Sequence, residues 1–325
     1  GIWYANQGLF GMVARGATIK NVTVTGLVDA DRSVGGIVGK NWGTVENCVN
    51  YASVKNYQSK GVGGIVGANW HDGAGASPII RDCTNYGSVE TAYGTGTAGG
   101  IAGEQEGLVE RCANYGTISP TTAGKGNIGG IAGTLKYYLT GTPGSIATVR
   151  ECFNAGAITN GQWTGGIVGQ VSSGPATILA CYNIGSVTGG GNTDYAGGIL
   201  GNNSGGAVIL TNCYNGAPIT AVNNAGAIAG SIRSDATTTN IYYLDGTAAV
   251  AYKAGSGAAT ATATSKTDAE MKDPAFAGQV SGDTGRAYAP STDAYPVLRW
   301  QIADTSTLSS ISIVTPPTKT VYIAG

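Results

Sequence analysis

The sequence has few charged residues and few of the side chains that usually carry out catalysis. Only 11% of its 325 residues are charged, 18 Lys and Arg nearly balance 19 Asp and Glu, and there is a single His. This composition excludes a basic nucleic-acid-binding groove and an acidic tail, so we expect no nucleic-acid partner. No run of 18 apolar residues occurs, and we therefore expect no membrane insertion by this fragment.

The short motifs of common enzymes and metal sites are also missing. HExxH, GxSxG, P-loop and CxxC patterns do not occur, and His71 stands between Trp70 and Asp72. The candidate acids Asp29, Asp31 and Asp72 fall in predicted loops, where we expect solvated turns. A calcium loop is the alternative, although the Asp, Asn and Gly series of known calcium motifs is lacking. We therefore predict no enzymatic activity, no catalytic residues, no metal and no cofactor.

Glycine, in contrast, is abundant, and it marks a repeat. The chain has 55 Gly, and a Gly-Gly pair followed by Ile and a second small-residue turn recurs every 28–36 residues. Gly8 to Gly11 form an earlier, degenerate copy. A repeat of this period indicates a solenoid, in which each unit buries its apolar face only against its neighbours. The copies begin at Gly35, Gly63, Gly99, Gly129, Gly165, Gly197 and, in weakened form, Gly226.

The second half of each repeat is equally regular. One Cys occurs per repeat, an Asn follows two residues later, and a β-branched residue follows six residues after the Cys. We predict that both residue types form structural columns, with one member in each coil. The Cys column contains Cys48, Cys83, Cys112, Cys152, Cys181 and Cys213, and the Asn column contains Asn50, Asn85, Asn114, Asn154, Asn183 and Asn215.

These patterns predict an all-β parallel β-helix of about eight coils. Each repeat reads as three short β-type segments separated by Gly and Asn turns, since β-branched residues suit a pleated buried surface. Helical repeats fail because Gly is so frequent and a 3.6-residue apolar period is missing outside one short C-terminal stretch. Leucine-rich repeats fail because the repeated apolar positions are Ile, Val and Cys.

An even number of Cys raises the question of disulfides. A disulfide needs two Cβ atoms about 3.8 Å apart that face each other, whereas stacked rungs lie about 4.8 Å apart with parallel side chains. We therefore expect reduced, buried and inert thiols. Disulfides and a metal site are the alternatives. The absence of a Cys/His pairing argues against the metal site.

Two further columns follow from the same register. Two residues before each Cys the series reads Glu46, Arg81, Glu110 and Arg150, and the alternating signs predict attraction between adjacent coils. Chance among exposed residues is the alternative. Three residues after successive Cys come Tyr51, Tyr86 and Tyr115, which we expect to form a stacked ladder at a corner rather than a binding site.

The best candidate for ligand binding is aromatic. Trp42 and Trp70 each lie seven residues after a Gly-Gly start, so they should be adjacent on neighbouring coils. We expect the two indoles to pack on each other, which would stabilise the corner by about 1 kcal/mol. The alternative is a ligand site made of Trp42, Trp70, His71 and Asp72, on a corner that the insertion from His71 to Pro78 lengthens into a loop.

After Ser231 the repeat pattern is lost. Ile241 to Leu244 predict one more strand, and residues 247–264 read as a loop. Thr267 to Glu270 have the spacing of a capping box, Pro274 should shorten or kink the helix that follows, and residues 295–300 read as a terminal strand. We expect this segment to cap the solenoid, which gives residues 1–300 as β-helix with cap and 301–307 as linker.

Residues 308–325 alternate like a strand and look like the truncated first strand of a bacterial Ig-like domain. The chain shows no signal peptide, and its first four residues lie in a repeat-like context, so we expect a piece of a longer protein.

The GGIVG and NCxNxG words together resemble the GLUG repeats of bacterial cell-surface proteins, over roughly residues 8–300. Such repeats occur in the non-catalytic region of IgA-protease-like chains and in large surface proteins of Gram-positive bacteria. The resemblance implies a right-handed β-helix and an extracellular setting on the bacterial cell surface. It does not imply protease activity.

Three functions remain in view. The first is a non-catalytic surface module, acting as adhesin or stalk, that binds a protein or glycan ligand on a host or neighbouring cell. The second is a self-assembling fibre subunit that associates through open coil ends or strand exchange. The third is a glycan-binding or glycan-active β-helix protein.

Overall fold

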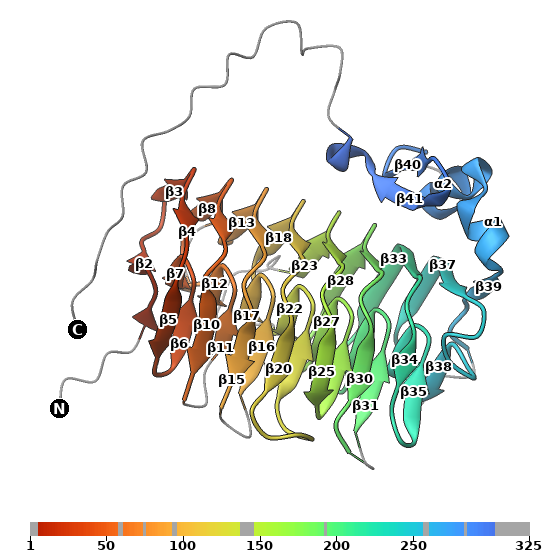
Figure 1. Cartoon of the computed structure of the whole chain (residues 1–325), viewed down its shortest axis with the longest axis horizontal. Coiled ribbons are helices and arrows are strands. Elements are labelled where there is room, and N and C mark those ends of the chain that lie inside the picture. Colours follow the sequence, from red (N-terminus) through yellow and green to blue (C-terminus); the bar gives the residue numbers. More distant parts are fainter. Residues whose placement is uncertain are drawn as a thin grey trace, which may run out of the picture.

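The computed structural model describes residues 6–57, 61–73, 76–92, 96–136, 146–191, 194–255, 260–282 and 285–302. Within these ranges the chain winds through successive coils of short strands that stack side by side (Figure 1). Equivalent strands of neighbouring coils pair in parallel and build four long sheets, here called A to D. This architecture confirms the predicted all-β parallel solenoid.

Sheets A and B meet at the Gly-Gly word of each repeat. Sheet A has eight strands, in agreement with the eight predicted coils: β1 (Asn6–Gln7), β6 (Ser33–Gly35), β11 (Gly61–Gly63), β16 (Thr97–Gly99), β21 (Asn127–Gly129), β26 (Trp163–Gly165), β31 (Tyr195–Gly197) and β35 (Asn224–Gly226). Sheet B has nine strands: β2 (Phe10–Val13), β7 (Val38–Asn41), β12 (Val66–Asn69), β17 (Ala102–Gln105), β22 (Ala132–Leu135), β27 (Val168–Val171), β32 (Leu200–Asn203), β36 (Ala229–Ser231) and β38 (Tyr252–Ala254).

Sheet C contains two columns of strands that fuse at β33 (Val208–Asn215) and continue into β37 (Thr237–Leu244) and β39 (Thr264–Lys266). Its first column is β3 (Thr18–Lys20), β8 (Thr44–Glu46), β13 (Ile79–Arg81), β18 (Leu108–Glu110), β23 (Ala147–Arg150) and β28 (Ala176–Leu179), and its second is β4 (Thr23–Val24), β9 (Val49–Asn50), β14 (Thr84–Asn85), β19 (Ala113–Asn114), β24 (Phe153–Asn154) and β29 (Tyr182–Asn183). Sheet D has seven strands: β5 (Leu27–Ala30), β10 (Ser53–Asn56), β15 (Val89–Thr91), β20 (Ile118–Pro120), β25 (Ile158–Gly161), β30 (Val187–Gly189) and β34 (Ile219–Thr220).

Each regular coil contains five short strands, so the prediction of three per repeat was wrong. Two sharp turns divide segments that the sequence pattern had joined. The Gly-Gly word separates the strand of sheet A from that of sheet B. The residue before each Cys takes a left-handed backbone, with φ of 49° at Asn47 and 55° at Asp82, and this separates the two columns of sheet C.

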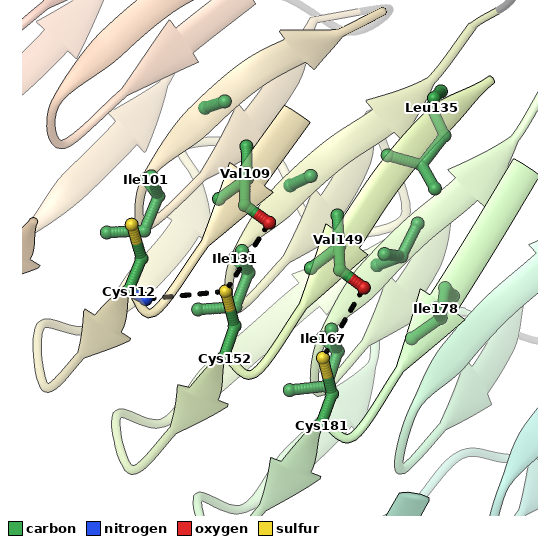
Figure 2. Close-up of a cluster of buried hydrophobic side chains, with 14 of the residues drawn as sticks. Ile101, Val109, Cys112, Ile131, Leu135, Val149, Cys152, Ile167, Ile178 and Cys181 are labelled. Atoms are coloured by element: carbon green, nitrogen blue, oxygen red, sulfur yellow. Dashed lines mark hydrogen bonds between the residues drawn. The ribbon is translucent and has the colours of Figure 1, made fainter. Parts of the chain in front are cut away.

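The Cys column lies in the main hydrophobic core. All six thiols are free and buried, as predicted, and they pack with the Ile and Val residues of sheets B and C (Figure 2). Each sulfur lies close to main-chain groups; the Cys152 Sγ, for example, donates to the Arg150 carbonyl oxygen at 3.1 Å. The column therefore fills the interior of the coils as a set of small apolar side chains.

The Asn column is a continuous buried ladder. Each Asn donates through Nδ2 to the Oδ1 of the Asn in the next coil at 2.7–2.9 Å, from Asn50 to Asn215. The same Nδ2 also donates to the carbonyl oxygen two residues onward, as from Asn85 to Gly87 at 2.8 Å. The ladder thus closes one turn in every coil and joins that coil to its neighbours, which satisfies buried amides.

The predicted surface columns are present as well. Arg81 pairs with Glu46 at 2.6 Å, Arg150 pairs with Glu110 at 2.5 Å, and the alternating charges attract as expected. Tyr51, Tyr86 and Tyr115 stack with ring centroids 4.9 Å apart and planes within 6°. These contacts are structural, and the partly exposed pair of Arg81 with Glu46 contributes about 0–1 kcal/mol.

The C-terminal segment forms two helices and a hairpin. Helix α1 (Asp268–Lys272) starts with the predicted capping box of Thr267 and Glu270, and α2 (Pro274–Ser281) begins at Pro274, which separates the two helices. Strands β40 (Tyr288–Ser291) and β41 (Ala294–Leu298) pair antiparallel and lead into a 3₁₀ turn, Arg299–Gln301. Part of the predicted loop at 247–264 instead forms β38, which extends sheet B.

This segment packs along the flank of sheet C, beside β33 and β37 (Figure 1). Its aromatic residues contact a stack of Phe153, Tyr182 and Tyr214, and the Trp300 Nε1 donates to the Glu151 carbonyl oxygen at 2.9 Å. We expected it to close the last open edge, whereas these contacts fix it to the side of coils far earlier in the chain. Apolar side chains on the outer face of these coils explain the position.

The predicted domain boundary falls at the edge of the described residues. Gln301 still belongs to the packed segment, since its Oε1 accepts from the Tyr182 hydroxyl at 2.9 Å. Residues 303–307 of the proposed linker and the Ig-like strand at 308–325 lie outside the described residues. Among those described, no helix is long and apolar enough to cross a membrane.

Candidate ligand-binding site

The candidate site lies at the corner where the strands of sheet B end. A short amide ladder fixes this corner: Asn41 Nδ2 donates to Asn69 Oδ1, and Asn69 Nδ2 donates to Gln105 Oε1, both at 2.7 Å. The residue that follows each ladder position donates its main-chain N–H to the ladder residue of the preceding coil, as from Trp70 to the Asn41 carbonyl oxygen at 3.2 Å. Trp42 and Trp70 are therefore adjacent, as the register predicted.

Lys40 lies against both indoles. Its Nζ lies 4.6 Å from the ring centroid of Trp42 and 4.4 Å from that of Trp70, so one ammonium is positioned over both rings. Both distances fall within the roughly 6 Å range of a cation–π interaction. Lys40 lies on β7, two residues before Trp42, and the repeat pattern did not single it out.

Two glutamates follow on the next coil. Glu106 occupies the position equivalent to Trp70, is only 5% exposed, and accepts from the His71 main-chain N–H at 2.9 Å through Oε2. Burial raises the pKa of Glu106, and the hydrogen bond from His71 partly opposes this. Glu104 is also buried and pairs with Lys136 Nζ at 2.8 Å.

His71 and Asp72 begin the lengthened corner loop. The His71 Nδ1 accepts from the Gly73 main-chain N–H at 3.0 Å, which fixes the ring against its own turn. Asp72 accepts from Arg15 Nε at 2.9 Å, so an arginine of the first coil reaches an acid of the third. Asp72 is thus an exposed loop residue, as expected, and an ion pair with Arg15 holds it in place.

All four predicted binding residues line one pocket of about 630 Å³. Its walls are formed by Trp42, Trp70, His71 and Asp72 together with Lys40, Glu106 and Lys136. Two of the three additional residues could have been found from the sequence. Glu106 and Lys136 stand seven residues after their own Gly-Gly starts, in the same register as the two Trp.

The other predicted acids lie elsewhere. Asp29 is on β5 rather than in a loop, and its carboxylate accepts from the Tyr57 hydroxyl at 2.8 Å. Asp31 is an exposed turn residue. Across the part of the chain that the structure describes, no group of three or more His, Cys, Asp or Glu could hold a metal ion.

The pocket offers indole faces, an ammonium, carboxylates and an imidazole on a rigid scaffold. Aromatic faces beside such polar groups can stack on a sugar ring or enclose a cationic group, and the polar groups can fix its orientation. Asp72 and Glu106 both carry carboxylates, but each is already engaged, by Arg15 and by the His71 main chain.

Comparisons with known proteins support the fold. No family model matches this sequence, and no curated protein matches it either. A solved structure from Bacteroides ovatus, described as a "putative immunoglobulin A1 protease", is similar over 91% of this chain and 96% of its own, with a TM-score of 0.53 and 18% identity. At this identity the likeness concerns the architecture.

Proposed function

We propose that this chain is a non-catalytic module of an extracellular bacterial surface protein, acting as adhesin or stalk. One observation carries the proposal: a pocket that combines two indoles with charged side chains lies at a lengthened corner of the solenoid. Binding residues concentrate on loops that a rigid scaffold positions.

The setting of the proposal comes from the repeat words. Their resemblance to GLUG repeats supports a location on the bacterial cell surface, beside an Ig-like domain that would start at residue 308. The similar structure from Bacteroides ovatus carries a protease name. In our proposal the repeats supply the scaffold of such proteins, and the engaged carboxylates of the pocket take no part in hydrolysis.

A glycan is the ligand class we propose first, since indole faces stack on sugar rings and the surrounding carboxylates and ammonium groups bind hydroxyls. A protein ligand on a host or neighbouring cell is the second. The test is a glycan array probed with the purified fragment and with the double variant Trp42→Ala/Trp70→Ala. Trp163→Ala is the matched control, because Trp163 is also half-buried but lies on β26 in sheet A.

The proposal predicts glycan signals that the double variant loses and the control retains. Signals that persist in the double variant would place binding elsewhere, and a uniformly negative array would direct the search to protein ligands. Circular dichroism of all three proteins shows whether a lost signal reflects a lost fold.

Self-assembly into fibres is a second candidate, favoured by the first coil. Phe10, Met12 and Leu27 are 37%, 51% and 67% exposed, and the strands that carry Phe10 and Leu27 are the outermost of sheets B and D. An outer strand with apolar side chains can pair with another chain. Sedimentation velocity over a hundredfold concentration range tests this; a monomer throughout would remove it.

A further inference from the structure

We propose that the pocket recognises an organic ammonium group on its ligand, and that the ligand competes with Lys40 for the two indoles. This inference deepens the proposed function and rests on it. It names the chemical group that the pocket selects, which the glycan proposal by itself leaves open.

The two indoles of the pocket are arranged to hold a cation. One ammonium, that of Lys40, is placed over two indoles at 4.6 and 4.4 Å. The indoles come from neighbouring coils whose main chains are hydrogen-bonded, at 3.2 Å between Trp70 N and the Asn41 oxygen. Their spacing is therefore fixed by the solenoid, and the pair of rings forms a preformed cation site.

The charged side chains that line the pocket also favour a cation. Glu106 faces the same pocket while being only 5% exposed, whereas Asp72 also lines the pocket but is paired with Arg15. The other lysine of the pocket, Lys136, is paired with Glu104 at 2.8 Å. A buried carboxylate beside two indole faces favours a cation over an anion or a neutral group.

The side chain that the indoles already hold indicates the ligand class. Lys40 is itself a primary ammonium on a flexible chain, and the site that holds it suits other organic ammonium groups. Methylated ammonium groups are the cations that aromatic cages bind best, because they are weakly hydrated. We infer a glycan bearing an amino sugar or a choline-type substituent; an exposed lysine of a protein is a separate outcome of the test.

The probe is tetramethylammonium chloride, titrated into the purified fragment against sodium chloride at equal ionic strength. Tryptophan fluorescence and indole N–H signals in NMR spectra report binding. Lys40→Ala is the informative variant, because Ala68 occupies the equivalent position of the next coil and shows that alanine fits there. The Trp42→Ala/Trp70→Ala variant and the Trp163→Ala control complete the set.

We expect Lys40→Ala to bind tetramethylammonium at least tenfold more tightly than the wild type, the double Trp variant to lose binding, and the control to match the wild type. Equal affinities of wild type and Lys40→Ala, or undiminished binding by the double variant, would overturn the inference. If the double variant does not fold, Trp70→Phe replaces it, and an affinity unchanged by that smaller ring would count against the inference as well.

The two proposals fail separately. Glycan binding that depends on both Trp but is insensitive to tetramethylammonium would leave the proposed function standing and remove the ammonium inference. Tetramethylammonium binding with a negative glycan array would leave the ammonium site standing and remove a glycan as its ligand. Competition by a lysine-rich peptide, without competition by glucosamine or choline, would overturn the glycan source of the ammonium.

Discussion

Gly64 and Asn85 are in direct contact across one coil, and their contact explains why the two repeated words occur together. A Cβ built on Gly64 would lie 2.3 Å from Asn85 Cγ, far inside any real contact. The second glycine of the pair meets the ladder Asn of its own coil in the same way at Gly36, Gly100, Gly130, Gly166 and Gly198. The glycine makes room for the amide ladder, and the ladder closes the turn.

Gly64→Ala should therefore destabilise the fold. The added methyl group would also lie 2.2 Å from the Gly100 carbonyl oxygen, which belongs to the next coil and cannot easily move. We expect a loss of about 3 kcal/mol or failure to fold, the upper range for overpacking. Gly278→Ala in α2 is the matched control; its Cβ meets nothing within 4 Å, so it should stabilise by about 0.5–1 kcal/mol. Equal urea midpoints for the two variants would contradict the account.

The six thiols should be unreactive in the folded protein. They are buried, so a reagent in solution cannot reach them, and burial raises the pKa of Cys83 and Cys152, which disfavours the reactive thiolate at these two positions. Labelling with a maleimide should be negligible in buffer and should reach all six Cys in denaturant without reductant. Rapid native labelling of several Cys would contradict the burial, and unlabelled Cys after denaturation would reveal disulfides.

Glu106 should make stability depend on pH. Its pKa is raised by burial above the ordinary value of 4.5, so the folded state holds this proton more tightly than the unfolded state. The free energy of unfolding then falls as the pH rises from the unfolded pKa through the folded one. Glu106→Gln removes this loss of unfolding free energy, so the variant should melt at a higher temperature than the wild type at neutral pH. The difference in melting temperature should disappear on acidification to about pH 4.

Glu90→Gln is the control for the loss of one charge, because Glu90 pairs with Lys55 on the surface. A melting temperature of Glu106→Gln that stays below the wild type at every pH would show that the carboxylate stabilises the corner instead.

The protein should not turn over substrates. Both pocket carboxylates are engaged by neighbouring groups, and we expect no cleavage of immunoglobulin A1 and no reducing ends released from a panel of polysaccharides. Electrophoresis and a reducing-sugar assay test this. Cleavage that Asp72→Asn or Glu106→Gln abolishes would replace the binding account with an enzymatic one.

Much of the scaffold could be predicted because the repeat itself sets the register. A fixed offset from each Cys predicted the Asn ladder and the pairing of Arg81 with Glu46, and both are present. The division into five strands was missed, because Arg111, with φ of 48°, shows no sequence signal of its left-handed turn. Such a residue adopts that backbone only because the stacked coils around it require it.

The site was predicted in part for the same reason. Register brought Trp42 and Trp70 together, and it would also have given Glu106. The position of the Lys40 ammonium depends on the rotamer of a long side chain, which spacing along the chain does not determine. The ion pair of Arg15 with Asp72 joins residues two coils apart, beyond the reach of neighbour-to-neighbour register.

The most direct test of the account measures the affinity of Trp70→Ala and its melting temperature on the same samples, with a glycan found on the array. We expect titration calorimetry to show a loss of about 1–2 kcal/mol or more in binding for Trp70→Ala. Trp163→Ala should bind like the wild type. A lowered melting temperature of Trp70→Ala with unchanged glycan affinity would show that the indoles only stabilise the corner, and would contradict the assignment of this pocket as the binding site.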